Sequence, residues 1–98
     1  MTAARAHLAN RRAADIVDFD HGGRRWTATI SKFPDGRIAE IFLDGAKASP
    51  LADLARETAI VASIALQHGA SEDTLRHAIA SHAASPLGEA LDLFKDEE

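Results

Sequence analysis

The residues best suited to chemistry lie in one short segment, residues 44–49, directly ahead of a predicted helix. Lys47 stands two residues before Ser49, which is the predicted N-cap of that helix. The ammonium group, the helix dipole and the first N–H groups of the helix would then face one point. We therefore expect Lys47 and Ser49 to bind phosphate, carboxylate or a nucleotide. The alternative is a solvated lysine beside a simple cap, and Asp44 weakens the case for an anion.

Basic residues near the predicted strands offer a second surface. Three arginines flank the first two predicted hairpin arms: Arg24, Arg25 and Arg37. Beside Trp26 they could hold a nucleotide or a single-stranded nucleic acid. Trp26 shares its strand face with other apolar residues, however, so its interpretation as a core residue is favoured and nucleic-acid binding is not expected. Arg37 joins Lys47 and Ser49 as a candidate for binding an anion or a nucleotide.

Other kinds of chemistry lack the necessary residues. The chain contains no cysteine, which excludes disulfides, a thiolate nucleophile and sulfur-ligated metals. Of its five histidines, His77 and His82 are five positions apart, and such a spacing turns two side chains about 140° away from each other on a helix. His68 is better explained by a favourable charge near a helix end than by metal ligation. We expect no catalytic residue, no metal and no cofactor.

Length and charge limit the organisation of the chain. The 98 residues can form one small domain, and the formal charge of −4 argues against a general nucleic-acid or anionic-membrane binder. We divide the chain into a flexible basic tail at 1–13, a single domain at 14–94 and an acidic tail at 95–98. No segment approaches the roughly 18 apolar residues of a membrane span, and no targeting segment is recognisable, so we expect a cytoplasmic protein.

Three strands are predicted before the first helix. Apolar and polar residues alternate over 16–20 and again over 24–32, with Gly22-Gly23 suited to the turn between them. Pro34-Asp35-Gly36 predicts a second turn, leading into a strand over 37–43. That strand has apolar residues on both faces, so we expect it to be central in the sheet or covered twice.

Three helices follow the strands. Ser49-Pro50 begins a long helix that ends at Gly69, Ser71 caps a second, and Ser85-Pro86 starts a short third. The long helix is apolar almost all round between 59 and 66, which predicts burial.

The predicted fold class is α+β, a three-stranded antiparallel meander followed by a long buried helix and two shorter helices. We expect Ile64 of the long helix to meet Trp26 across the interface with the sheet. Apolar surface remaining on the third strand and on the far side of the long helix indicates a homodimer.

The second helix allows another interpretation. Residues 65–71, followed by EDTLRHAIA, have the spacing of a helix-turn-helix, which would make the chain a nucleic-acid-binding regulator. The recognition helix would carry Arg76 and His77, but also the acidic residues Glu72 and Asp73, so it is poorly suited to binding phosphates. A simple αα-hairpin is the other alternative.

Three segments resemble a known family. FPDGRIAEIFLDGAK, AIVASIALQHGAS and SPLGEALDLF are similar to the TSCPD-type domain found near the C-terminus of adenosylcobalamin-dependent (class II) ribonucleotide reductases, and also as stand-alone proteins. The resemblance runs over about residues 14–94. The residues matching the family's pattern are Gly36, Arg37, Glu40, Ile41, Phe42, Lys47, Ser49, Ser63, Ala65, Leu66 and Gly69.

The resemblance implies an accessory, regulatory or nucleotide-sensing domain with a ribonucleotide reductase or a nucleotide as partner. The cysteine motif that gives the domain its name is missing, Ala48 replaces a loop glycine, and Ala70 and Ser71 replace a common Val-Pro pair. Reductases of this family also need a large barrel, a radical-bearing cysteine and cobalamin, which these 98 residues cannot hold. The expected domain is therefore not catalytic alone, even where such chains are grouped with ribonucleoside-diphosphate reductases.

Overall fold

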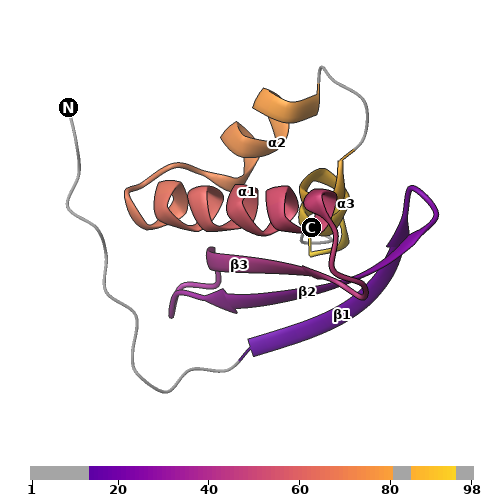
Figure 1. The fold of residues 1–98 in the computed structure, drawn as a ribbon. Coiled ribbons are helices and arrows are strands. Elements are labelled where there is room, and N and C mark those ends of the chain that lie inside the picture. The colour runs from indigo at the N-terminus through magenta and orange to yellow at the C-terminus, as the bar shows by residue number, and fades with distance from the viewer. Residues whose placement is uncertain (1–13, 81–84, 95–98) are drawn as a thin grey trace.

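A computed structural model describes residues 14–80 and 85–94, and Figure 1 shows a sheet covered on one side by helices. The predicted tails at 1–13 and 95–98, and His82, lie outside the described residues. The elements are β1 (Ala14–His21), β2 (Arg24–Lys32), β3 (Ile38–Gly45), α1 (Pro50–Gln67), α2 (Glu72–Ala80) and α3 (Pro86–Leu93). The predicted α+β class, with three antiparallel strands before three helices, is confirmed. Within the described part of the chain, no helix combines the length and the apolar character needed to cross a membrane.

The strands pair in the order β1-β2-β3, so β2 is the central strand and β3 lies at an edge. The expected turns form, because Gly22 and Gly23 take positive φ angles of 61° and 75° and Gly36 donates its N–H to the carbonyl of Phe33 at 2.9 Å. Of the two alternatives expected for the third strand, a central position in the sheet is therefore wrong.

The apolar character of β3 has another cause, which is its cover by α1. The Ser63 hydroxyl accepts the N–H of Ile41 at 2.8 Å and lies 2.9 Å from the Ile41 carbonyl oxygen. Gln67 donates its side-chain amide to the carbonyl of Ala39 at 3.0 Å. Side chains of α1 therefore satisfy backbone groups that an edge strand leaves unpaired.

One face of α1 is buried and the other is exposed. The buried face carries small residues, among them Ala52, Ala55, Ala59 and Ala62. Ile64 lies on the opposite side with 39% of its surface exposed, and it is twelve positions along the helix from Ala52, which packs near Trp26. The expected contact between Ile64 and Trp26 is therefore wrong, because a helix apolar all round does not reveal from its sequence which face meets the sheet.

The two shorter helices are tied to the sheet by polar contacts. The Glu72 carboxylate accepts the N–H of Ile38 at 2.9 Å and a hydrogen bond from Arg76 at 3.2 Å. Arg76 also donates to the carbonyl of Leu91 at 2.8 Å, which joins α2 to α3. At the other end of the sheet, Nδ1 of His21 lies 2.8 Å from Glu89. The strand ends, α2 and α3 therefore hold one another in place.

Candidate functional site

A cleft of about 430 Å³ opens between the turn joining β1 to β2 and the loop that follows β3. The antiparallel register produces it, because Trp26 at the start of β2 stands opposite Gly45 at the end of β3. The N–H of Ala46 then donates to the carbonyl of Arg25 at 3.0 Å, which holds the loop against the sheet. The cleft lining includes Gly22, Gly23, Arg24, Arg25, Trp26, Lys47 and Ser49.

Trp26 forms a closed wall of this cleft. Only 1% of its surface is exposed, and its indole N–H donates to the carbonyl of His21 at 3.2 Å. An indole so enclosed offers no open face on which a nucleobase could stack. The prediction that Trp26 is a core residue is confirmed.

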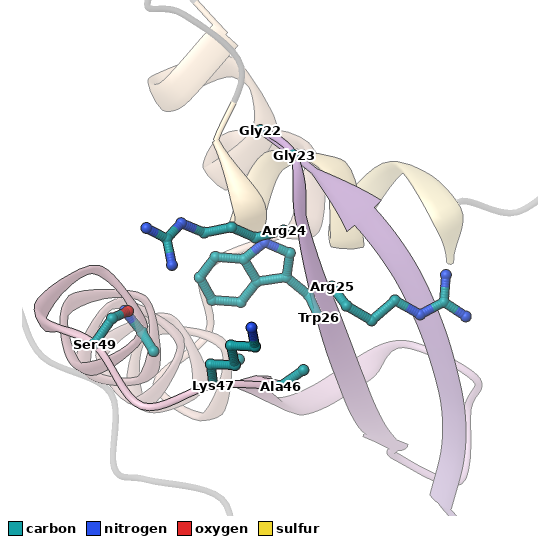
Figure 2. Close-up of a pocket in the computed structure, with 10 residues that line it drawn as sticks. Gly22, Gly23, Arg24, Arg25, Trp26, Ala46, Lys47 and Ser49 are labelled. Carbon is teal, nitrogen blue, oxygen red and sulfur yellow. The ribbon is translucent and has the colours of Figure 1, made fainter.

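Two cationic side chains line the cleft together. Figure 2 shows Arg24 and Lys47 extending on either side of the Trp26 indole in this view. Both residues are exposed, and neither has an ion-pair partner among residues 14–80 and 85–94. Among the described residues, no carboxylate forms an ion pair with either cation, so an anion would be attracted to the cleft.

Arg25 takes the opposite direction. Its guanidinium points away from Lys47 and Trp26 in Figure 2 and lies 3.2 Å from the Asp20 carboxylate. Arg25 also lines the cleft, but neighbouring residues of a strand project to opposite faces, so its guanidinium does not join the Arg24 guanidinium there. Arg25 is therefore a natural comparison for Arg24.

Ser49 acts as the N-cap of α1. Its hydroxyl accepts the N–H of Ala52 at 3.0 Å, and its carbonyl accepts the N–H of Asp53 at 3.0 Å. Pro50, the first helical residue, has no N–H. Most of the N–H groups expected to face an anion are therefore satisfied or missing, and the positive charge of the cleft comes from the two side chains.

Arg37 lies at the other end of β3, and the eight residues of that strand span roughly 25 Å. Its guanidinium lies 2.7 Å from Asp35 and 4.9 Å from the centre of the Phe33 ring. The backbone N–H of Arg37, followed by its side chain, lowers the pKa of Asp35. The structure brings Lys47 and Ser49 together but not Arg37, whose charge is held within its own turn.

Arg24 is the cleft residue that sequence reasoning did not join to Lys47. The two residues are far apart in the chain and meet only through the pairing of β2 with β3. The signal available in the sequence was the Gly22-Gly23 turn, which fixes a tight hairpin and brings Arg24 to its end.

The predicted recognition helix holds its arginine inward. The Arg76 side chain is 14% exposed, and it contacts Glu72, Asp73 and the Leu91 carbonyl. An arginine held in this way is not presented to a phosphate backbone. Within the described residues, no group of three or more histidine or acidic side chains is arranged to hold a metal ion.

Comparison of the chain with family models, with curated proteins and with solved structures found no match in any of the three.

Proposed function

We propose that this chain is an accessory or regulatory domain related to ribonucleotide reductase, which senses a nucleotide in the cytoplasm and is not catalytic alone. The observation that carries the proposal is the pair of exposed cations, Arg24 and Lys47, lining one cleft without ion-pair partners in the described structure. The relation to the reductase is supported by the resemblance of residues 14–94 to the TSCPD-type domain.

The chemistry of the cleft favours the phosphate end of a nucleotide. A chain of phosphates carries several negative charges and acceptor oxygens, which suit a guanidinium and an ammonium that line the same cleft. The enclosed indole of Trp26 provides no stacking surface for a base. Binding should accordingly strengthen with the number of phosphates and weaken with salt.

Calorimetric titration and thermal unfolding test this proposal with inorganic phosphate, nucleoside monophosphates and nucleoside triphosphates. Triphosphates should raise the unfolding temperature, because a ligand that prefers the native state stabilises it. Lys47→Ala and Arg24→Ala should abolish the rise, whereas Arg25→Ala should preserve it because the Arg25 guanidinium points away and is paired with Asp20. If no nucleotide or phosphate binds at millimolar concentration, or if Arg24→Ala and Lys47→Ala leave the rise unchanged, the cleft is not the site.

The relation to a reductase needs a separate test. Affinity capture from the native host, followed by mass spectrometry, should recover a ribonucleotide reductase with the wild-type chain. The purified chain alone should form no deoxynucleotide, with or without adenosylcobalamin, because it has no cysteine to carry a radical. Deoxynucleotide formation by a clean preparation would contradict the assignment to an accessory role.

We also propose that the chain forms a homodimer, which the exposed apolar side chains of α1 support. The packing of Arg76 against α3 gives no support to a helix-turn-helix regulator. A salt-dependent mobility shift with duplex DNA would instead support the helix-turn-helix regulator.

A further inference from the structure

The two faces of the sheet are covered unequally. Figure 1 shows helices on one side of the three strands, and no helix among the described residues lies over the other side, called here the far face. Alternation along the strands and the pairing register assign the side chains of the far face. They are Ala14, Ile16, Asp18 and Asp20 of β1, Arg25, Thr27, Thr29 and Ser31 of β2, and Glu40, Phe42 and Asp44 of β3.

One end of the far face is buried although the rest is open. Ile16 and Phe42 are 69% and 39% exposed, as expected of an uncovered face. Ser31 and Glu40 pair with each other in the same row as Ala14, and they are only 5% and 7% exposed. A glutamate is rarely buried to this extent unless a charge or a hydrogen-bond donor compensates for its lost hydration. The end of the face beside Ala14 is therefore where a cationic cover is required.

The far face is acidic. Its strands carry one arginine, Arg25, and four acids, Asp18, Asp20, Glu40 and Asp44. Three described arginines pair with aspartates on or beside this face, Arg25 with Asp20 at 3.2 Å, Arg37 with Asp35 at 2.7 Å and Arg56 with Asp44 at 3.6 Å. These arginines are directed to carboxylates other than that of Glu40, so an additional cation on this face would be favourable.

The segment that adjoins the buried end is basic. Residues 1–13 contain three arginines, Arg5, Arg11 and Arg12, and no acid. They join β1 at Ala14, which lies two strand spacings from Glu40, or about 10 Å. On an extended chain Arg12 projects to the same side as Ala14, which is the far face, whereas Arg11 projects to the opposite side. Thirteen extended residues span about 40 Å, which is ample to cross three strands.

We infer that residues 1–13 dock on the far face of the sheet and that Arg12 forms an ion pair with Glu40. The guanidinium supplies the partner that a buried glutamate requires, and both side chains are long enough to meet across the row of Ala14. A segment joined directly to the face meets it at a high effective concentration, which favours it over a separate basic partner. This interaction is independent of the cleft and of the proposed homodimer.

A nitroxide label tests the docking by NMR, since the chain has no cysteine of its own and Ala9→Cys provides a single attachment point. The label should strongly broaden the amide signals of Glu40 and Phe42 on β3. It should leave the signal of Val61, on the exposed side of α1, unchanged. Equal broadening on both sides of the molecule, or none on β3, would show that residues 1–13 do not dock on the far face.

The adjacent arginines provide a matched pair of variants. Arg12→Gln in the labelled chain should remove most of the broadening on β3, whereas Arg11→Gln, the same chemical change one residue earlier, should preserve it. Glu40→Gln should reproduce the effect of Arg12→Gln, and the two changes together should do no more than either alone. Circular dichroism checks that each variant is folded. Equal effects of Arg11→Gln and Arg12→Gln would contradict the pairing of Arg12 with Glu40.

A mixed sample shows whether the segment docks on its own chain. Isotope-labelled chains without nitroxide are mixed with nitroxide-labelled chains that carry no isotope, so that broadening can arise only between copies. The β3 signals should remain sharp. Broadening of the Glu40 signal in this sample would overturn docking within one chain and assign the segment to the far face of a second copy.

Discussion

The two faces of α1 reverse the usual distribution of side-chain size. The face against the sheet is built mainly from four alanines and Ser63, with Leu66 and Gln67 at its end, whereas the solvent face carries Leu51, Leu54, Ile60, Val61 and Ile64. Small residues let the helix axis approach β3 closely, and only at close approach can the Ser63 hydroxyl reach the backbone of Ile41 at 2.8 Å. The buried face of α1 is therefore the one whose small side chains allow the helix to approach the sheet closely, and hydrophobicity alone does not decide it.

The largest expected effect comes from enlarging the inner face. Ala59 is completely buried, so Ala59→Leu should lower the free energy of unfolding by about 3 kcal/mol, because the helix must move away from the sheet. Val61→Leu, a smaller enlargement on the outer face, should change it by no more than about 0.5 kcal/mol. Urea denaturation measures both. If Ala59→Leu is as stable as the wild type, the inner face of α1 does not require a small side chain at this position.

A second prediction compares two hydroxyl groups of α1, each of which donates to the carbonyl four residues earlier. Ser63 donates to Ala59, and Thr58 donates to Leu54. Only the Ser63 hydroxyl also contacts β3. Ser63→Ala should cost about 2 kcal/mol, since it leaves buried backbone groups of Ile41 unpaired. Thr58→Ala should cost at most about 0.5 kcal/mol. If the two variants lose equal stability in urea denaturation, the bond to the strand contributes nothing.

A smaller effect is expected where β3 meets the start of α1. A Cβ added at Gly45 would lie 2.9 Å from the Cβ of Ala52 and 3.3 Å from the carbonyl oxygen of Lys47. Gly45→Ala should therefore cost about 1 kcal/mol and weaken any ligand binding in the cleft. Adding Ala52→Gly should relieve the contact, so the double variant should be more stable than the sum of the single changes predicts. A strictly additive cycle would show that no close contact exists there.

The smallest effect is expected on the outer face. Leu54→Gln, measured at a dilution at which the wild type is monomeric, should change the free energy of unfolding by no more than about 0.5 kcal/mol. Thermal unfolding at high concentration should then show a larger difference between the two proteins, because only the wild type gains from association. A large loss of stability in the dilute monomer would show that Leu54 packs within its own chain.

Local features of this fold were predictable from sequence. Gly22 and Gly23 make the first turn, Gly36 closes the second, and Ser49, Ser71 and Ser85 each accept the N–H expected of an N-cap. Such features depend on a few adjacent residues, whose side chains and allowed φ angles decide the conformation. The element order follows from them, since each boundary carries its own signal.

Features that depend on distant residues were not predictable. The apolar ring of α1 does not indicate that Ala59 faces β3 and Ile64 faces away. The pattern of β3 does not show that it is an edge strand, because Ser63 and Gln67, which bond to its backbone, come from a distant helix. The cleft requires the register that sets Trp26 opposite Gly45, which no local pattern specifies. Each of these features depends on which residues, distant in the sequence, come into contact in the folded chain.

The polar contacts of β3 have a consequence for hydrogen exchange. The N–H of Ile41 donates to Ser63 of α1, and the N–H of Ile38 donates to Glu72 of α2. Each amide can exchange with deuterated water only when its own helix moves off the strand. Two amides three residues apart on one strand therefore report separately on the opening of two different helices, so deuterium uptake can show whether α2 detaches before α1.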